Sequence, residues 1–183
     1  FELFPPKTEK GEATLASTVR KLTDANPAYF SVTYGAGGST REGTERVVEM
    51  VRAETGRLVA HHLTCIGASR VEIDAQAERL HAAGITRLVA LRGDLPDGAR
   101  LAEDGYGDAA ELVAGLRNVG DFDISVAAYP ETHPEAASDQ ADLDHLKRKI
   151  DAGADRAITQ YAFDTDTILR FVDRARAGGI EAP

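Results

Sequence analysis

Several residue types are scarce or absent in this chain. Among its 183 residues there are one cysteine, one methionine and no tryptophan, and no apolar run approaches the length of a membrane span. The lone cysteine, Cys65, cannot form an internal disulfide, so we expect a reducing, cytoplasmic environment. Because a span needs about 18 or more consecutive apolar residues, we expect no contact with a membrane.

Basic residues are also in deficit. The chain has 21 lysines and arginines against 30 aspartates and glutamates, a formal net charge of -9. Such a field repels polyanions, so we expect small-molecule substrates and no nucleic-acid partner. The hydrophobic content of 43% nevertheless suffices for a folded core. The chain starts at Phe1 without a signal-type segment, and we expect both ends to be incomplete.

What the chain does contain is one pattern repeated six times, a short apolar strand followed by a segment with helical spacing. The pattern predicts strands at 1–4, 29–33, 58–63, 87–91, 124–128 and 156–160. It predicts helices at 13–24, 41–55, 71–83, 108–119, 140–151 and 165–177. Glycines at the ends of four of these helices predict left-handed caps, namely Gly84, Gly120, Gly153 and Gly178.

Strands that alternate with helices pair in parallel through right-handed crossovers, which leaves an open doubly wound sheet or a (β/α)8 TIM barrel. Glu2 favours the barrel, because it shares a strand face with Phe4 and an open sheet buries only apolar groups there. Six units are two short of closure, and a full barrel needs about 250 residues. We therefore interpret residues 1–183 as a single catalytic barrel domain that stops before strands 7 and 8.

Each predicted strand has a polar group at its carboxyl end, where barrel enzymes hold their reactive groups. Loops are polar in general, so the same pattern is also consistent with ordinary strand ends. The polar groups, in chain order, are Glu2, Thr33, His62, the run Arg92-Gly93-Asp94, Tyr129 with His133, and Gln160.

Glu2 is the most informative of these residues. Its neighbours Phe1, Leu3 and Phe4 are apolar, which predicts burial of the carboxylate. Burial would raise its pKa and suit it to deliver a proton near neutral pH. A buried structural ion pair is the alternative.

Six motifs resemble those of methylenetetrahydrofolate reductase, the bacterial-type flavoprotein. They occur in the family's order and with similar spacing, from the first residue to the last, which implies the N-terminal three-quarters of the family's catalytic barrel. The motifs are FELFPP at 1–6, SVTYGAGG at 31–38, HLTC at 62–65, ALRGDLP at 90–96, DISVAAYPETHPEA at 123–136 and LKRKIDAGADRAITQYAFD at 146–164.

The resemblance implies an oxidoreductase of one-carbon and methionine metabolism that acts on a CH–NH bond. The family binds FAD, takes a hydride from NADH or NADPH and reduces 5,10-methylenetetrahydrofolate to 5-methyltetrahydrofolate. Glu2 matches the family's catalytic glutamate, which protonates the N10 side of the methylene bridge. Asp94 matches a catalytic aspartate beside the flavin that also contacts the folate pterin, and Gln160 matches a folate-binding glutamine. The family is often oligomeric, so a homo-oligomer is among the expected partners.

The resemblance also implies a FAD site. The matched positions are Thr33, Tyr34, Ala36, His62, Arg92, Gly93, Asp94, Tyr129, His133, Ala136, Asp142, His145, Arg148 and Lys149. The last four recur at steps of three and four residues, so they can share one helix face that holds ribose hydroxyls and a pyrophosphate. Without the resemblance, such a run is typical of a solvated face. His145 departs from the family, which has asparagine there.

We expect no metal site, because His61 and His62 are adjacent on a strand and point to opposite faces.

Two further function classes stay open. One is a tetrahydrofolate-binding barrel that transfers a methyl group, and the other is an inactive truncated barrel whose unpaired sheet edges require a larger assembly.

Overall fold

The computed structural model describes residues 1–34, 41–94 and 102–183 of the chain, in which six strands alternate with six helices. The strands are β1 (Glu2–Leu3), β2 (Tyr29–Val32), β3 (Leu58–Thr64), β4 (Arg87–Leu91), β5 (Asp123–Ala128) and β6 (Arg156–Thr159). The helices are α1 (Glu9–Thr23), α2 (Arg41–Thr55), α3 (Arg70–Ala82), α4 (Ala109–Val119), α5 (Asp139–Asp151) and α6 (Thr165–Ala177). None of the helices in these ranges is long and apolar enough to cross a membrane.

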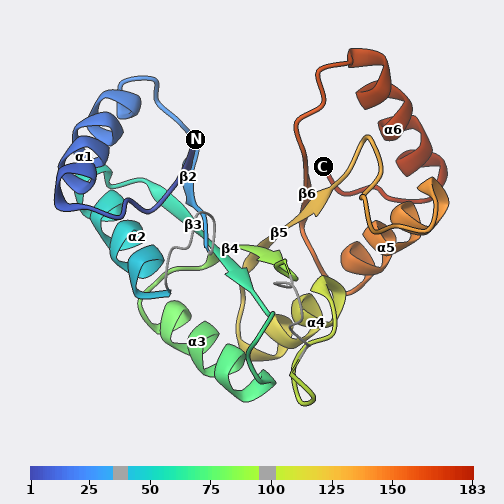
Figure 1. The fold of residues 1–183 in the computed structure, drawn as a ribbon, viewed down its shortest axis with the longest axis horizontal. Helices are drawn as coiled ribbons and strands as arrows, with labels where there is room; N and C mark the ends of the chain where they lie inside the picture. Colours follow the sequence, from blue (N-terminus) through green and yellow to red (C-terminus); the bar gives the residue numbers. More distant parts are fainter. Residues whose placement is uncertain (35–40, 95–101) are drawn as a thin grey trace.

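The strands form one parallel sheet in which each strand pairs with its neighbours in sequence, from β1 to β6. In Figure 1 the sheet curves with the strands inside and the helices outside, and the two chain ends lie on either side of the opening. The strand order never reverses, as it would in a doubly wound sheet. The molecule is therefore a half-barrel, and the prediction of six parallel βα units is confirmed.

The predicted boundaries agree with the structure within about two residues, except at the first unit. α2, β4 and α6 begin and end at the predicted residues. β1 is limited to Glu2–Leu3, and α1 begins at Glu9, four residues before the predicted position 13. The side chain of Thr8 accepts the Gly11 backbone N–H at 3.1 Å and caps this earlier turn. The apolar spacing therefore located the buried part of α1 but missed its exposed first turn.

Two of the four predicted glycine caps are left-handed. Gly84 and Gly153 have φ values of +73° and +115°. The prediction is wrong at Gly120, which is extended, and at Gly178, because the left-handed residue after α6 is Gly179 at φ +75°. Gly120 is required for another reason, since a Cβ there would lie 2.9 Å from the ring of His81.

The apolar core lies between the sheet and the helices. Alternate residues of the central strands, such as Phe30, Val32, Leu88, Ile124 and Val126, are fully buried there. Because the side chains of a strand alternate between its two faces, the intervening residues point to the inner side of the half-barrel.

The inner side carries charged groups at the amino-terminal ends of the strands. Asp123 pairs with Arg87, with 3.2 Å between Oδ2 and Nη2, and also with Arg156. The Arg87 guanidinium lies 5.2 Å from the centre of the Tyr29 ring. These contacts join the amino-terminal ends of β2, β4, β5 and β6 into a polar floor, at the end of the strands opposite to the predicted site.

Candidate functional site at the carboxyl ends of the strands

The first group of predicted site residues lies on β1 to β3. The Oε2 atom of Glu2 lies 3.7 Å from Nε2 of His62. Thr33 follows β2, and its backbone N–H donates to the Leu3 carbonyl at 2.9 Å. The parallel register pairs Val32 with His61, so the next residues along the two strands, Thr33 and His62, are neighbours. Three predicted residues from separate strands are thus brought together.

The environment of Glu2 differs from the expectation. Its side chain is 53% exposed, and Phe4 is 59% exposed, so the prediction that Glu2 is buried is wrong for the described chain. His62 is the buried member of the pair, with a side chain that is 9% exposed. Burial lowers the pKa of His62 to about 4, which keeps the imidazole neutral at pH 7. The contact with Glu2 is therefore between a carboxyl group and a neutral ring.

Tyr129 is the centre of a second group, formed by β4, β5 and β6. Burial raises the pKa of the Tyr129 phenol, while a hydrogen bond with the Gln160 side chain acts in the opposite direction. The charges of Asp94 and Asp142 raise this pKa further and that of Arg92 lowers it, so all three lie within electrostatic reach of the phenol. The Gln160 backbone N–H donates to the Ala128 carbonyl at 2.8 Å, which aligns the end of β6 with that of β5.

The loop after β5 places His133 beside Tyr129. The two rings meet edge to face, with centroids 4.6 Å apart. The His133 backbone N–H donates to Oδ2 of Asp142 at 2.8 Å, and the Glu135 N–H donates to Nδ1 of the His133 ring at 3.1 Å. The Ala136 N–H closes the turn on the His133 carbonyl at 2.9 Å. The predicted aspartate of α5 is thus engaged with this loop.

The segment after β4 carries a left-handed glycine. Gly93 has φ +90°, and a Cβ at this position would lie 2.6 Å from the side chain of Ile66, so both the backbone conformation and the close contact require glycine. Asp94, which follows it, is exposed. Arg92 forms an ion pair with Glu135 at 2.9 Å, which ties this segment to the loop after β5.

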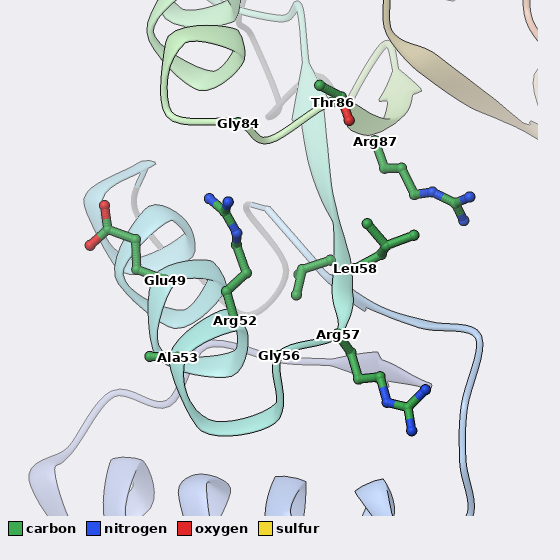
Figure 2. Close-up of a pocket in the computed structure, with 10 residues that line it drawn as sticks. Glu49, Arg52, Ala53, Gly56, Arg57, Leu58, Gly84, Thr86 and Arg87 are labelled. Carbon is green, nitrogen blue, oxygen red and sulfur yellow. The ribbon is translucent and has the colours of Figure 1, made fainter.

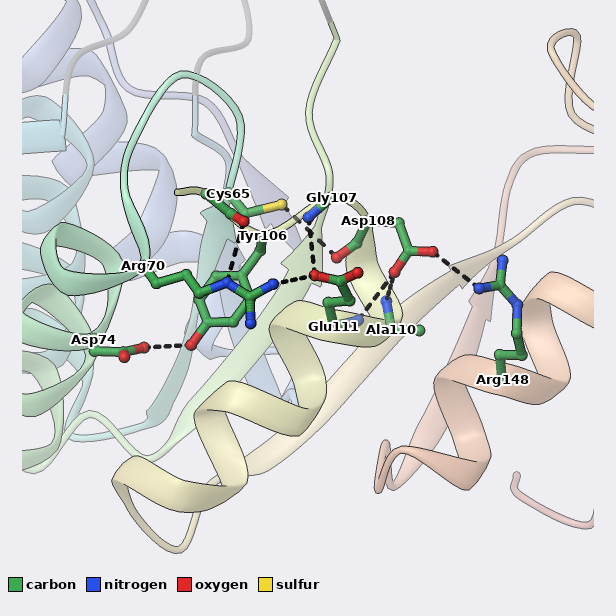
Figure 3. Close-up of polar contacts among 10 residues, drawn as sticks. Cys65, Arg70, Asp74, Tyr106, Gly107, Asp108, Ala110, Glu111 and Arg148 are labelled. Atoms are coloured by element: carbon green, nitrogen blue, oxygen red, sulfur yellow. Dashed lines mark hydrogen bonds and ion pairs between the residues drawn. The ribbon is translucent and has the colours of Figure 1, made fainter. Parts of the chain in front are cut away.

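A third group lies between α4 and α5, and Figure 3 shows its centre, Asp108. One carboxylate oxygen of Asp108 caps α4 by accepting the N–H groups of Ala110 and Glu111, both at 2.9 Å. The other oxygen lies 3.2 Å from Nη1 of Arg148 and 3.6 Å from Nε2 of His145. Burial would raise the pKa of Asp108, but these donors and cations together hold it below its usual value.

Figure 3 also shows what fixes the start of α4 against α3. The Tyr106 hydroxyl donates to Asp74 at 2.6 Å, and Arg70 lies over the Tyr106 ring, 4.7 Å from its centre. Arg70 further pairs with Glu111 at 2.5 Å. The start of α4 is therefore held against α3 on one side, and the Asp108 carboxylate faces α5 on the other.

The charged face predicted on α5 is only partly presented to solvent. The Arg148 side chain is 62% exposed, and that of His145 is 35% exposed. Lys149 is 5% exposed, and its Nζ donates to the Ala127 carbonyl of β5 at 2.6 Å. Burial lowers the pKa of Lys149 to about 8. Lys149 is therefore buried between α5 and β5, whereas Arg148 lies on the exposed face of α5.

Other predicted residues have fewer contacts. Tyr34 is partly buried at the end of the described segment 1–34, and Ala36 lies outside the described residues. Sequence reasoning missed Asp108 and Glu135, which pair with the predicted residues Arg148 and Arg92. An aspartate directly before an apolar helix is an N-cap signal, which would have located Asp108 as the cap of α4 but not its contact with α5.

A hollow of about 530 Å³ lies elsewhere in the described residues. It is lined by Leu58 and Arg87, which begin β3 and β4. Figure 2 shows it at the carboxyl end of α2, beside Arg52, Gly56 and Arg57. These are the amino-terminal strand ends, so this hollow is separate from the candidate site. No three His, Cys, Asp or Glu side chains of residues 1–34, 41–94 and 102–183 are grouped so that they could hold a metal ion.

Comparison with solved structures defines the class of fold. A putative lyase/mutase from Burkholderia cenocepacia matches with a TM-score of 0.67 at 20% identity, over 100% of this chain and 66% of the other. An uncharacterized protein from Clostridium thermocellum, described as binding two copies of 5-methyl-5,6,7,8-tetrahydrofolic acid, matches with a TM-score of 0.66 at 13% identity, over 100% and 61%. At these identities the likeness concerns the fold alone, in which parallel strands alternate with helices.

Comparison of sequences identifies the family. The family model for methylenetetrahydrofolate reductase matches residues 1–183, and the chain belongs to this family. It is 52% identical to a 5,10-methylenetetrahydrofolate reductase from Pectobacterium carotovorum and 50% identical to that of Escherichia coli, over 99% of this chain in each case. It spans 60% of the length of both relatives. A relative from Arabidopsis thaliana, named methylenetetrahydrofolate reductase (NADH) 1, is 39% identical and matches over 33% of its length.

Proposed function

We propose that this protein reduces 5,10-methylenetetrahydrofolate to 5-methyltetrahydrofolate with bound FAD and a nicotinamide dinucleotide as the hydride donor. The observation that carries the proposal is the family match over residues 1–183, together with the gathering of the matched residues at one edge of the sheet. The name of the Arabidopsis relative supports NADH as the first donor to test, with NADPH as the comparison.

The described residues fit a polar, anionic cofactor such as FAD. Four buried polar atoms at this edge have no hydrogen-bond partner in the described residues, namely Thr33 Oγ1, His62 Nε2, Thr64 Oγ1 and His145 Nε2. Buried polar atoms normally have partners, so this set is consistent with a bound ligand that supplies them. Arg148, exposed on α5, would hold the pyrophosphate, and Asp142 would accept from a ribose hydroxyl. The rings of Tyr129 and His133 would lie beside the flavin.

When bound, FAD would supply the two-electron chemistry that connects the nicotinamide to the folate. The chain's own residues would handle the proton and the charge. The Glu2 carboxyl group delivers its proton to N10 of the folate as the bond between N10 and the methylene carbon breaks, which leaves a cationic carbon to accept the hydride. The Asp94 carboxylate stabilises this positive charge, and the Gln160 amide hydrogen-bonds the folate ring.

We also propose that the protein completes an eight-stranded barrel around this site and works as a single catalytic domain. The Ala157 N–H on the open edge of β6 donates to the Pro183 carbonyl at 2.9 Å, which is the position a next parallel strand would take. The curated bacterial relatives are longer than this chain, since it spans 60% of their length. Relatives of such length have enough residues for two more units.

The experiment that tests the function is an absorbance spectrum of the purified full-length protein, followed by anaerobic addition of NADH. We expect bound flavin that bleaches on addition of NADH and recovers its colour on addition of methylenetetrahydrofolate. A colourless protein that cannot be reconstituted with FAD would refute the proposal. A colourless protein that binds tetrahydrofolate would favour methyl transfer on the same fold.

A further inference from the structure

The turn between β5 and α5 contains a strained residue. Thr132 has φ +69°, in the left-handed region that glycine and asparagine tolerate but that β-branched residues rarely adopt. The Thr132 N–H donates to the Tyr129 carbonyl at 3.2 Å, so the strained residue closes the turn. A residue stays in such a conformation only where the surrounding structure imposes it.

Two helices supply that constraint. The Thr132 hydroxyl donates to Oδ1 of Asp139, in the first turn of α5, at 2.8 Å. Arg174 of α6 donates to the other oxygen, Oδ2, at 3.0 Å. The Thr132 hydroxyl and Arg174 hold the pKa of Asp139 below its usual value, so the carboxylate is charged over the working pH range. Asp139 therefore connects the turn before α5 to both α5 and α6, and we call these two contacts of Asp139 the bracket.

The turn carries two of the residues that we propose to contact the flavin. Tyr129 precedes Thr132 by three residues, and His133 follows it directly. Their rings are in edge-to-face contact at 4.6 Å, and the His133 N–H is held by Asp142. If residue 132 relaxed to an ordinary conformation, the chain direction would change between the two rings. The contact therefore depends on the left-handed conformation of Thr132.

We propose that Thr132 and Asp139 are positioning residues of the flavin site, which hold Tyr129 and His133 in their binding arrangement through a strained turn. The inference rests on the proposed function, because it explains the strained turn by the position of residues that bind the flavin. Neither residue needs to touch the cofactor. Their effect passes through the backbone of the turn, and Arg174 extends the bracket to α6.

The test compares variants of the full-length protein for FAD affinity and melting temperature. Thr132→Asn introduces a residue that tolerates the left-handed region without β-branching, and Thr132 lines an open hollow of about 370 Å³ with room for the larger side chain. Asp139→Asn removes the bracket's charge. Asp144→Asn is the matched control, because Asp144 lies on the same helix, where its side chain accepts a hydrogen bond from Gln140 at 2.8 Å.

We expect Thr132→Asn to raise the melting temperature by about 2–4 °C and to leave the FAD dissociation constant unchanged, because asparagine keeps the left-handed conformation with less strain. Asp139→Asn should weaken FAD binding by several-fold, because the contact that holds the turn loses its charge, and Asp144→Asn should leave FAD binding unchanged. The visible circular dichroism of the bound flavin should change in Asp139→Asn and not in Thr132→Asn or the control, a result that a general loss of stability would not produce.

Two results would overturn the inference. The first is wild-type FAD affinity in Asp139→Asn. The second is a Thr132→Asn protein that is less stable than the wild type, because its turn is then not strained. If Thr132→Asn fails to fold, the comparison of Asp139→Asn with Asp144→Asn decides. A wild-type protein that binds no FAD is a separate outcome, which refutes the proposed function itself.

Discussion

The two proposed catalytic carboxylates, Glu2 and Asp94, have different surroundings. Glu2 lies 3.7 Å from the neutral ring of His62, on the first strand of the half-barrel. Asp94 follows the left-handed Gly93 and lies within electrostatic reach of the Tyr129 phenol. Glu2 therefore has an uncharged ring as its partner, whereas Asp94 shares the surroundings of Tyr129 with Arg92 and Asp142. The proposed reaction gives the two residues different tasks.

Replacement of Glu2 by glutamine tests the proton-donor role. Glu2→Gln should reduce the rate of folate reduction by about 100-fold or more, because glutamine cannot deliver a proton. Oxidation of NADH by the flavin should remain largely intact, since that half-reaction does not need this proton. The two half-reactions are measured separately by anaerobic stopped-flow absorbance. Equal loss in both would indicate that Glu2 is structural.

Replacement of Asp94 by asparagine tests the electrostatic role. Asp94→Asn should slow folate reduction by about tenfold or more, because the negative charge that stabilises the cationic folate is lost. The flavin's reduction potential should become more positive, because a nearby negative charge disfavours the electron-rich reduced ring. Glu103→Gln, at an acidic residue of the described loop before α4, serves as a control of equal charge change. An unchanged potential in Asp94→Asn would place its side chain away from the ring.

At the scale of an element, β3 shows how one strand serves both the core and the site. Its adjacent histidines point to opposite faces, with His61 in the core and His62 beside Glu2. Both ring nitrogens of His61 lack partners in the described residues. Burial lowers the pKa of each histidine to about 4, and in His61 the neighbouring His62 adds to the effect. The strand is therefore folded with both imidazoles neutral.

This arrangement predicts a loss of stability in acid. Each pKa is about 4 in the folded protein against 6.5 in the unfolded chain, so the unfolded state binds more protons between these values. The free energy of unfolding is therefore highest above pH 6.5. It decreases as the pH falls towards 4, by about 3 kcal/mol for each histidine. His61→Leu should reduce this pH dependence by about half, as measured by urea unfolding from pH 7 to pH 4. A comparison of the two proteins at pH 8 controls for changes in packing, and an unaltered slope would contradict the prediction.

At the scale of the whole molecule, the half-barrel separates two ends with different chemistry. The amino-terminal strand ends are joined by the ion pairs of Asp123, whereas the carboxyl ends carry the proposed site. Arg148 reaches that site from α5, held by Asp108 at the start of α4. The position of the Arg148 side chain depends on two helices and the strands between them. Ligand binding to Arg148 should therefore stabilise the molecule as a unit.

This coupling predicts a thermal shift. FAD at 100 times its dissociation constant should stabilise the full-length protein by about 2.7 kcal/mol, which raises the melting temperature by roughly 5–10 °C. Arg148→Ala should reduce the shift at the same FAD concentration, because the pyrophosphate loses its cation. Lys147→Ala is the matched control, since Lys147 pairs with Asp151 at 2.7 Å on the same helix. Equal shifts in the two variants would exclude Arg148 from the site.

Most of the fold was readable from the pattern of residues. Alternating apolar strands and amphipathic helices predict all six βα units, because the apolar spacing that marks each element lies within a short stretch of sequence. The exceptions are at the ends of helices. The first turn of α1 lacks the apolar spacing, Gly120 is extended against the His81 ring, and the left-handed residue after α6 is Gly179 and not Gly178.

The candidate site was readable only in part. The sequence by itself determined the six parallel βα units, the family and the set of polar residues at the strand ends, since these depend on residue type and order. The tertiary structure decided that Glu2 is exposed beside a buried neutral His62, that Lys149 donates into β5, and that Asp108 and Asp139 hold α5 and its preceding turn. Burial and charge pairing join residues far apart in the chain, so the solvation of Glu2 and the partners of Arg148 exist only once the six strands are side by side.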